Sequence, residues 1–413
     1  MAEWVMKKLK DIANFNPRES LAKGVVAKKV AMDKLQPFCR DIPGYELEPF
    51  SGGTKFRNGD TIMARITPCL ENGKTAKVAV LDDGEVGFGS TEYIVFRAKD
   101  GIDEDFIYYL VCSPLVREPA IKSMVGSSGR QRVQTDVVQN LEIMVPDYEE
   151  QKRISGILKS LDDKIAANTE VNKNLEEQAV MLFRSWFSAF SLSPNSPRVN
   201  SEFGEIPEDF AVVKVGSLPM LVTDYVANGS FASLKANVNL YQEPNYAYFI
   251  RNTDLKSGSF GVFVDQHSYE FLSKSTLYGG EIIISNVGDV GSVFLCPKLD
   301  GRMTLGNNII MLRPEDDHLR YYLYIWFKYF QGQALIQGIK GGSAQPKFNK
   351  TDFKNTSVLI PPKDILTRFH ETVAPMFETI SQRQAETSRL ADLRDTLLPQ
   401  LMSGEIDVSD LDL

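Results

Sequence analysis

The feature of this sequence that most constrains its fold is an internal duplication. A glycine-rich loop, a short apolar segment ending in proline and a long helical run follow one another twice, beginning at residues 126–131 and again at residues 341–347. The polar centres of the two helical runs start near Ala166 and Ser381, 215 positions apart. This period is far above the roughly 20–50 residues of a solenoid repeat, so the sequence predicts two copies of one domain.

Three further pairs of segments occur in the same order in both halves. They are residues 3–9 with 209–215, residues 59–63 with 280–284, and residues 108–110 with 321–323. Their offsets drift between 206 and 221 positions, so insertions and deletions separate the copies. A protein built from two such copies is expected to read a partner that has two sites of its own.

Bulk properties place the chain among ordinary globular proteins. Its 413 residues allow two to four domains, and 43% hydrophobic residues suit globular cores. No apolar run approaches the ~18 residues of a membrane span, and the first residues show no apolar signal-peptide core. The four cysteines lie far apart, without zinc or disulfide spacing, which favours a reduced, cytoplasmic location.

The net charge of −8 argues against a generically basic nucleic-acid binder, although the distribution of charge weakens that objection. Residues 1–30 hold seven Lys and Arg against three acids, and residues 328–354 hold five lysines against Asp352. Phosphate contacts act within a Debye length of about 8–10 Å, so local basic segments count for more than the total. Ordinary surface charge remains the alternative interpretation of these segments.

Two long helices are predicted at residues 147–190 and 363–404. Asp147 and Glu150 form a helix start after Pro146, whereas Pro375 is expected to kink the second helix. The apolar spacing is that of a coiled-coil seam with two asparagines at its centre, so we expect the helices to pair antiparallel. The alternative is that each packs on a separate core. The predicted seam consists of Ile154, Leu158, Leu161, Ile165, Asn168, Asn172, Leu175, Leu182, Val373, Ile380, Leu390 and Leu397.

The rest of the chain divides around these helices into two modules, at residues 1–146 and 209–362. Strands are expected at residues 61–66, 92–96, 281–285 and 308–312, and short helices at residues 106–112 and 318–330. Residues 191–208 are expected to be a linker, and residues 405–413 an acidic tail. The predicted fold class is α+β, with two similar mixed α/β domains separated by a pair of long antiparallel coiled-coil helices and related by an internal pseudo-two-fold.

Signatures of catalysis are missing from the sequence. No glycine-rich loop follows a strand in a dinucleotide or Walker pattern, and the three histidines have no metal-ligand spacing. We therefore expect no catalytic residues, no metal site and no enzymatic activity of this chain alone.

Three strings of residues together resemble the specificity (S) subunit of Type I restriction–modification systems. They are Met181-Leu182-Phe183-Arg184-Ser185-Trp186-Phe187, Glu205-Ile206-Pro207-Glu208-Asp209-Phe210 and Leu397-Leu398-Pro399-Gln400-Leu401-Met402-Ser403-Gly404-Glu405-Ile406. The resemblance extends over essentially the whole chain.

This resemblance implies that each module is a target-recognition domain that reads one half of a bipartite, asymmetric double-stranded DNA site. It implies that the helices set the distance between the halves and dock two methyltransferase subunits, which methylate adenine N6, with restriction and translocase subunits joining them. S-adenosylmethionine, ATP and Mg²⁺ are then expected on those partners, and no cofactor on this chain. The competing hypothesis is a non-catalytic coiled-coil scaffold that binds only proteins.

Base reading requires polar side chains on exposed loops, and glycine-rich loops let the backbone approach phosphates. The sequence does not give the bases recognised, the spacer length, or whether a nuclease subunit is present. The DNA-binding candidates in the first module are Arg65, Ser90, Thr91, Glu92, Arg130, Gln131 and Arg132. Those in the second are Ser285, Asn286, Asn307, Asn308, Lys340, Gln345 and Lys347.

Overall fold

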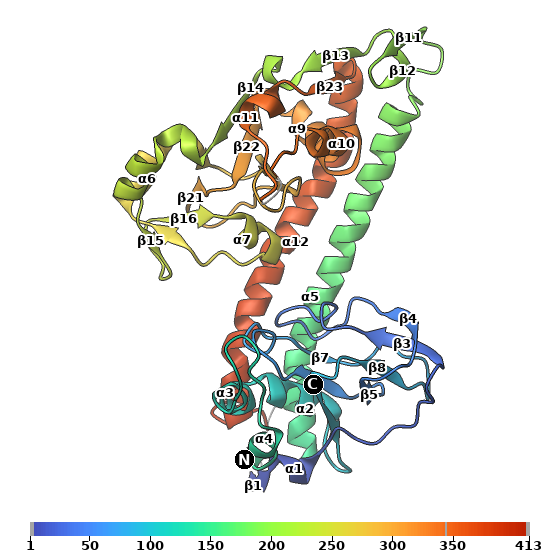
Figure 1. Cartoon of the computed structure of the whole chain (residues 1–413), viewed down its shortest axis with the longest axis vertical. Helices are drawn as coiled ribbons and strands as arrows, with labels where there is room; N and C mark the ends of the chain where they lie inside the picture. Colours follow the sequence, from blue (N-terminus) through green and yellow to red (C-terminus); the bar gives the residue numbers. More distant parts are fainter. Residues whose placement is uncertain (1–3, 343–344, 410–413) are drawn as a thin grey trace. The chain divides into compact units, whose positions relative to one another are not determined.

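The computed structural model describes residues 4–342 and 345–409, and these form two compact units (Figure 1). Unit 1 comprises Met1–Ala167 with Arg389–Leu413, and unit 2 comprises Asn168–Ser388. Each unit therefore contains part of helix α5 (Tyr148–Phe183) and part of helix α12 (Lys363–Ser403). Residues 1–3 and 410–413 of the predicted first segment and acidic tail lie outside the described residues.

Unit 1 is a mixed α/β unit with three small sheets. The strands pair as β1-β10, β2-β9-β6-β7 and β4-β3-β8-β5, with β3 and β8 parallel. Before α5 the elements are β1 (Val5–Lys8), α1 (Leu9–Ile12), β2 (Ala13–Phe15), β3 (Val26–Val30), β4 (Glu46–Pro49), β5 (Thr54–Phe56), β6 (Thr61–Ala64), β7 (Thr75–Lys77), β8 (Gly87–Gly89), β9 (Tyr93–Ala98), α2 (Glu104–Cys112), α3 (Pro114–Lys122), α4 (Thr135–Gln139) and β10 (Glu142–Val145).

Unit 2 repeats this plan with additional elements. Its strands pair as β13-β23, β14-β22-β19-β20 and β15-β17-β16-β21-β18, with β16 and β21 parallel. Between α5 and α12 lie η1 (Arg184–Ser188), β11 (Arg198–Ser201), β12 (Gly204–Pro207), β13 (Ala211–Lys214), η2 (Val215–Ser217), β14 (Met220–Asp224), η3 (Tyr225–Asn228), α6 (Phe231–Asn237), β15 (Leu240–Tyr241), β16 (Ala247–Ile250), α7 (Asn252–Ser257), β17 (Phe263–Val264), α8 (Gln266–Phe271), η4 (Ser273–Ser275), β18 (Thr276–Leu277), β19 (Ile282–Ser285), β20 (Val293–Leu295), β21 (Arg302–Leu305), β22 (Ile309–Pro314), α9 (His318–Tyr329), α10 (Gln331–Gly338), α11 (Lys350–Lys354) and β23 (Ser357–Ile360).

The repeated topology confirms the mixed α/β fold with two similar halves. The four strands predicted from β-branched and aromatic residues are β6, β9, β19 and β22, each in the middle of its four-stranded sheet. All residues of β6 and β19 are buried, which explains their near-continuous apolar sequence. The two predicted short helices are α2 and α9.

The long helices contribute directly to the core of each unit. In unit 1, Ile154 and Leu158 of α5 share a buried cluster with Leu401 and Met402 of α12. In unit 2, Phe183 of α5 lies in the core with residues of α9, β22 and α12. Each such side chain contributes roughly 1.5–3 kcal/mol when fully buried. The apolar faces of the long helices are therefore covered in both of the ways considered from the sequence. The two helices contact each other, and each also packs on the core of a unit.

Within each unit α5 and α12 run antiparallel. Asp162 pairs with Arg394 in unit 1, and Asn168 pairs with Arg383 in unit 2. The later residue of α5 thus contacts the earlier residue of α12. The predicted seam residues Ile154, Leu158, Asn168 and Val373 are buried, and the other predicted seam residues are half-buried. Leu393, which continues the apolar stripe in sequence, is 47% exposed. Arg394, the next residue, occupies the buried position instead.

The start of α5 has the predicted cap, but the end of α5 and the proline within α12 differ from a simple helix end and a helix break. Asp147 accepts a hydrogen bond from the backbone N–H of Glu150 at 2.9 Å, as expected for a cap, but the Glu150 carboxylate pairs with Arg153 and not with the cap residue. Helix α5 ends at Phe183 and continues as the π-helical turn η1. Helix α12 runs unbroken through Pro375.

Residues 191–208, predicted to be a linker, contain a structured hairpin. Strands β11 and β12 pair antiparallel, and Ile206 on β12 is buried in the core of unit 2. The prolines, serines and asparagines of this segment suggested a linker without secondary structure of its own. The local alternation in Arg198–Ser201 is too short to reveal a hairpin that is stabilised by packing on a distant core.

Candidate nucleic-acid interface

In unit 1, three segments meet where strand β6 ends. The Arg65 N–H donates to the carbonyl of Glu92 (2.9 Å), and the Val133 N–H donates to the carbonyl of Arg65 (2.9 Å). An isolated bridge joins Ile66 to Arg132. We call this meeting point the unit 1 junction, defined by Arg65, Glu92 and Arg132.

The side chains of the unit 1 junction form a charged cluster. Arg132 donates from Nε and Nη2 to the Glu92 carboxylate, with the shortest distance, Nη2 to Oε1, at 2.6 Å. These hydrogen bonds, together with the positive charges of Arg132 and Arg65, hold the pKa of Glu92 below its ordinary value. Arg65 Nη2 donates to the Val133 carbonyl at 3.4 Å, while its buried Nε has no acceptor within the described part of the chain.

The loops next to the unit 1 junction carry the remaining candidates from this module. The Ser90 hydroxyl accepts a hydrogen bond from the Glu92 N–H (3.1 Å), and Thr91 between them is exposed. The Gln131 carbonyl accepts from the Thr67 N–H at 3.0 Å. A Cβ at Gly126, where φ is +136°, would lie 2.9 Å from the Arg130 carbonyl, so this tight loop requires glycine. The structure thus brings all seven candidates of the first module together.

In unit 2 the same junction occurs at the end of β19. The Asn286 N–H donates to the carbonyl of Asn308 (3.1 Å), and the Phe348 N–H donates to the carbonyl of Asn286 (3.0 Å). A bridge joins Val287 to Lys347. We call this the unit 2 junction, defined by Asn286, Asn308 and Lys347.

Four other candidates of the second module surround or approach this junction. Asn307, Lys340 and Gln345 are exposed, and Lys340 donates to Gln337 at 3.1 Å. The loop from Gly341 to Lys347 is closed by two backbone hydrogen bonds of 2.9 Å between those residues. Ser285 is fully buried in the central strand β19, so the structure does not present it to a partner. Its position in the sequence, one residue before the junction, gave no sign of that orientation.

The two junctions are equivalent residue by residue and differ in chemistry. The backbone bonds place Arg65, Glu92 and Arg132 in unit 1 where Asn286, Asn308 and Lys347 stand in unit 2. Asn308 adopts the left-handed region with φ of +65°, which asparagine tolerates well. Lys347 is exposed and has no ion pair among residues 4–342 and 345–409. One frame therefore holds an ion pair in unit 1, and in unit 2 it holds two amides and an exposed lysine.

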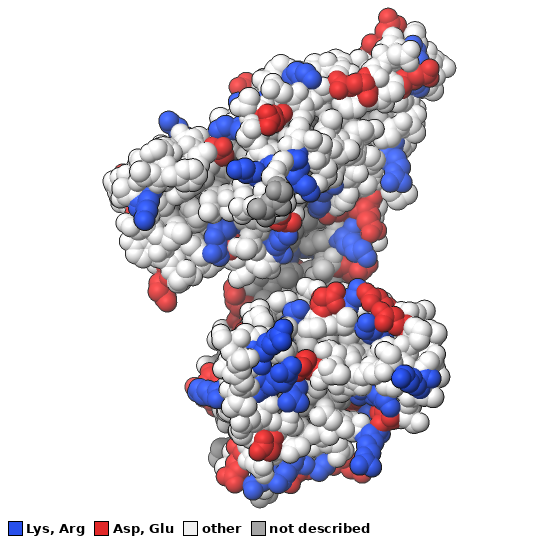
Figure 2. All heavy atoms as spheres, in the orientation of Figure 1, with Lys and Arg blue, Asp and Glu red and all other residues white. Residues whose placement is uncertain are grey.

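The surface charge is dispersed. On the face shown in Figure 2, Lys and Arg occur in small groups among acidic and uncharged residues. This distribution agrees with the net charge of −8, and any contact with phosphates would have to come from such local groups.

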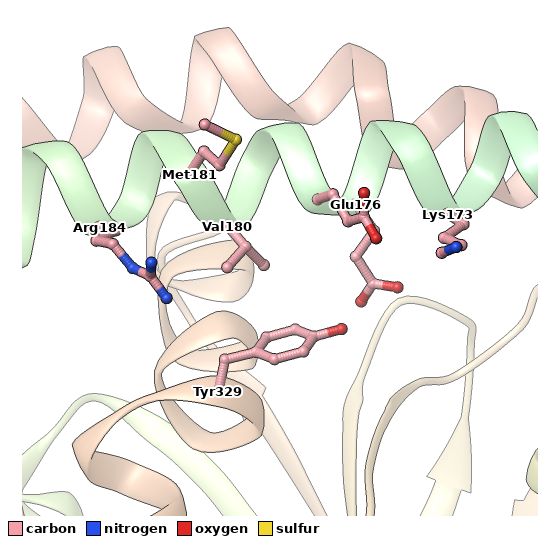
Figure 3. A pocket seen from close by; sticks show the side chains of 7 residues that line it. Lys173, Glu176, Val180, Met181, Arg184 and Tyr329 are labelled. Carbon is pink, nitrogen blue, oxygen red and sulfur yellow. The ribbon is translucent and has the colours of Figure 1, made fainter. Parts of the chain in front are cut away.

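A hollow of about 370 Å³ lies in unit 2 between α5 and the end of α9 (Figure 3). Met181, 70% exposed, and Tyr329, 44% exposed, supply much of its apolar lining. Burial alone would raise the pKa of Glu176, but Lys328 at 2.8 Å and the hydroxyl of Tyr324 lower it, so the carboxylate is ionised. The hollow offers an apolar surface beside a satisfied ion pair.

Neither a metal-ligand cluster nor a membrane-spanning helix occurs in the described residues. No three His, Cys, Asp or Glu side chains there could hold a metal ion together. None of the helices in that part of the chain is both long and apolar enough to cross a membrane. Sequence reasoning missed the buried pair of Asp162 and Arg394, because neither residue belongs to an apolar stripe.

Comparisons with known proteins complete these observations. The family model "Type I restriction modification DNA specificity domain" matches residues 1–177 and 207–386. The chain is 28% identical over 323 residues to the Type I restriction enzyme MjaIX specificity subunit of Methanocaldococcus jannaschii, covering 76% of this chain and 71% of the relative. It is 24% identical over 428 residues to the HindI specificity subunit of Haemophilus influenzae, covering 89% of each. A crystal structure of a Type I restriction-modification S subunit from M. genitalium has the same fold, with a TM-score of 0.54 at 16% identity over 97% of this chain and 96% of that one.

Proposed function

Because the chain belongs to the family of Type I restriction–modification DNA specificity subunits, we propose that each of its units reads one half of a bipartite, asymmetric DNA site. The family provides DNA specificity to a complex and is not catalytic.

The repeated junction is the observation that carries the proposal. The same backbone frame presents polar side chains in both units, as two readers built from one plan require. The side chains differ at all three equivalent positions, so the two half-sites should differ in sequence. Arginine, asparagine and lysine are residue types that form hydrogen bonds with base edges. The site is therefore expected to be asymmetric.

The long helices are proposed to serve two further purposes. Both α5 and α12 continue from one unit into the other, so their lengths, 36 and 41 residues, should fix the unspecific gap between the half-sites. Their exposed faces should also dock two methyltransferase subunits that modify adenine N6. The apolar hollow at Met181 and Tyr329 is a candidate contact for one of them.

Chemistry would then reside on partner subunits. S-adenosylmethionine is expected on the methyltransferases, and ATP and Mg²⁺ on any restriction and translocase subunits that join. A joined pair of weak readers gains affinity because binding of one half raises the effective concentration of the other.

The experiment is to co-express the chain with its methyltransferase subunit and map adenine methylation across the host genome. A split motif, with two different defined halves around an unspecific gap, supports the proposal. Exchange of residues 209–362 for those of a relative should then change one half only. A complex that forms but adds no sequence-dependent methylation would instead favour a scaffold that binds only proteins.

A further inference from the structure

We propose that Glu92 is a positioning residue that holds Arg132 for recognition of a guanine in the half-site read by unit 1. This inference rests on the proposed function and goes beyond it, because it assigns one base to one unit. The unit 2 junction lacks this guanine contact.

The geometry of the ion pair leaves one edge of the guanidinium available. A guanidinium has five N–H donors in a planar fork. Glu92 accepts from Nε and Nη2, at distances of 2.6–3.0 Å. The nearest acceptor of Nη1 is the Arg130 carbonyl at 3.5 Å, a weak contact. Among the described residues, the outer edge formed by Nη1 and Nη2 has only this weak contact, so it can take a second bidentate acceptor.

Exposure and charge point to a nucleic-acid ligand for that edge. The Arg132 side chain is 45% exposed, and that of Glu92 is 23% exposed. The carboxylate of Glu92 is therefore less accessible to a ligand than the guanidinium of Arg132. A carboxylate at a DNA-facing surface is repelled by phosphates unless it has a specific partner. Guanine offers O6 and N7 as adjacent acceptors in the major groove, and a bidentate arginine is the commonest specific contact to them.

The unit 2 junction provides an internal contrast. Asn308 stands where unit 1 has Glu92, and Lys347 stands where it has Arg132. An amide gives no charged support, and a lysine is a flexible point charge without a planar fork. The same backbone frame therefore predicts a fixed guanine contact in one half-site and none from the corresponding residues in the other.

The test uses the full-length chain in complex with its methyltransferase subunit. Once the split motif is known, competition binding with duplexes altered at single base pairs measures discrimination at each position. Arg132→Lys keeps the charge and removes the fork, and Glu92→Gln keeps the shape and removes the anionic support. Glu118→Gln, in an exposed unit 1 ion pair, is the matched control.

We expect Arg132→Lys and Glu92→Gln to relax discrimination by roughly 5- to 150-fold at one and the same G·C pair, and only in the half read by unit 1. Glu118→Gln should leave every position unchanged. Equal weakening of all duplexes by Glu92→Gln would show a merely structural role and overturn the inference. Unchanged discrimination in both junction variants would overturn it as well, while the split motif itself would still stand. A parent complex without a split motif would be a failure of the proposed function instead.

Discussion

At the scale of single residues, the protein contains a buried ion pair that the apolar pattern of its sequence does not predict. Asp162 is 5% exposed and Arg394 is 8% exposed, and Nη1 of Arg394 lies 2.8 Å from Oδ1 of Asp162. The Asp162 carboxylate also accepts a hydrogen bond from the Tyr109 hydroxyl at 2.7 Å. The loss of one partner would leave an uncompensated charge in the core of unit 1. Such a charge costs more than the intact pair contributes.

We therefore predict that Arg394→Met lowers the free energy of unfolding of unit 1 by roughly 3–5 kcal/mol. The thermal midpoint of the purified chain measures this loss. Asp395→Asn is the control, because Asp395 contacts the same guanidinium from the surface and its change should have little effect. Asp162→Leu combined with Arg394→Met should be less damaging than Arg394→Met alone. A single variant as stable as the parent would contradict this account.

A second prediction at this scale concerns pH. Burial, and then the nearby His318, lower the pKa of His370, and Asp317, Arg320 and the Tyr321 ring also face it. A histidine with a folded-state pKa below its unfolded value of about 6.5 binds a proton first in the unfolded chain. Stability should therefore fall as the pH drops below about 6.5.

His370→Gln should weaken that acid-side decline, as measured by thermal midpoints between about pH 7.5 and pH 5.5. His267→Gln is the matched control, because His267 is exposed on α8. If parent and His370→Gln lose stability in parallel, another group is responsible for the pH dependence.

At the scale of elements, the helix pair has a polar centre that specifies its register. Asn168 is fully buried, donates to Glu386 at 2.8 Å and accepts from Arg383 at 2.7 Å. Asn168 and Arg383 are themselves 215 positions apart, the offset that relates the two helical runs. Equivalent positions of the duplicated helix thus contact each other, as an antiparallel pair of repeats predicts. A buried polar group of this kind disfavours sliding of one helix along the other.

Asn168→Ala should lower the stability of unit 2 by roughly 1–3 kcal/mol, because it leaves the half-buried Arg383 without this acceptor. Hydrogen exchange of the backbone amides around residues 168 and 383 should report the loss directly. Asn174→Ala on the exposed face of the same helix is the control and should exchange like the parent. Unchanged protection in Asn168→Ala would mean that apolar packing alone fixes the register.

At the scale of the whole molecule, α5 and α12 are proposed to act as a ruler between two readers. Removal of one turn of about four residues from each helix shortens both by roughly 6 Å. The unspecific gap in the methylated motif should then change by about one to two base pairs, with both halves unaltered. Methylation mapping of the co-expressed complex provides the readout. A deletion variant that methylates the parental motif with its parental gap would refute the ruler.

Features that depend on neighbouring residues could be predicted from the sequence alone. Runs of β-branched and aromatic residues predicted β6, β9, β19 and β22, coiled-coil spacing predicted the two long helices, and the cap at Asp147 predicted the start of α5. The duplication followed from ordered pairs of short segments. These signals are local, or they compare one stretch of sequence with another, so no three-dimensional information is needed to find them.

Contacts between residues far apart in the chain are set by its three-dimensional packing and could not be predicted. Glu92 and Arg132 lie 40 positions apart, and Asp162 and Arg394 lie 232 apart. Their contacts arise because strand ends and helices from separate segments pack together, which propensity and periodicity do not encode. For the same reason the burial of Ser285 and the hairpin β11-β12 escaped prediction. The polar residues of both junctions were predicted from the sequence. The equivalent backbone contacts that bring them together, with different side chains in each unit, are visible only in the fold.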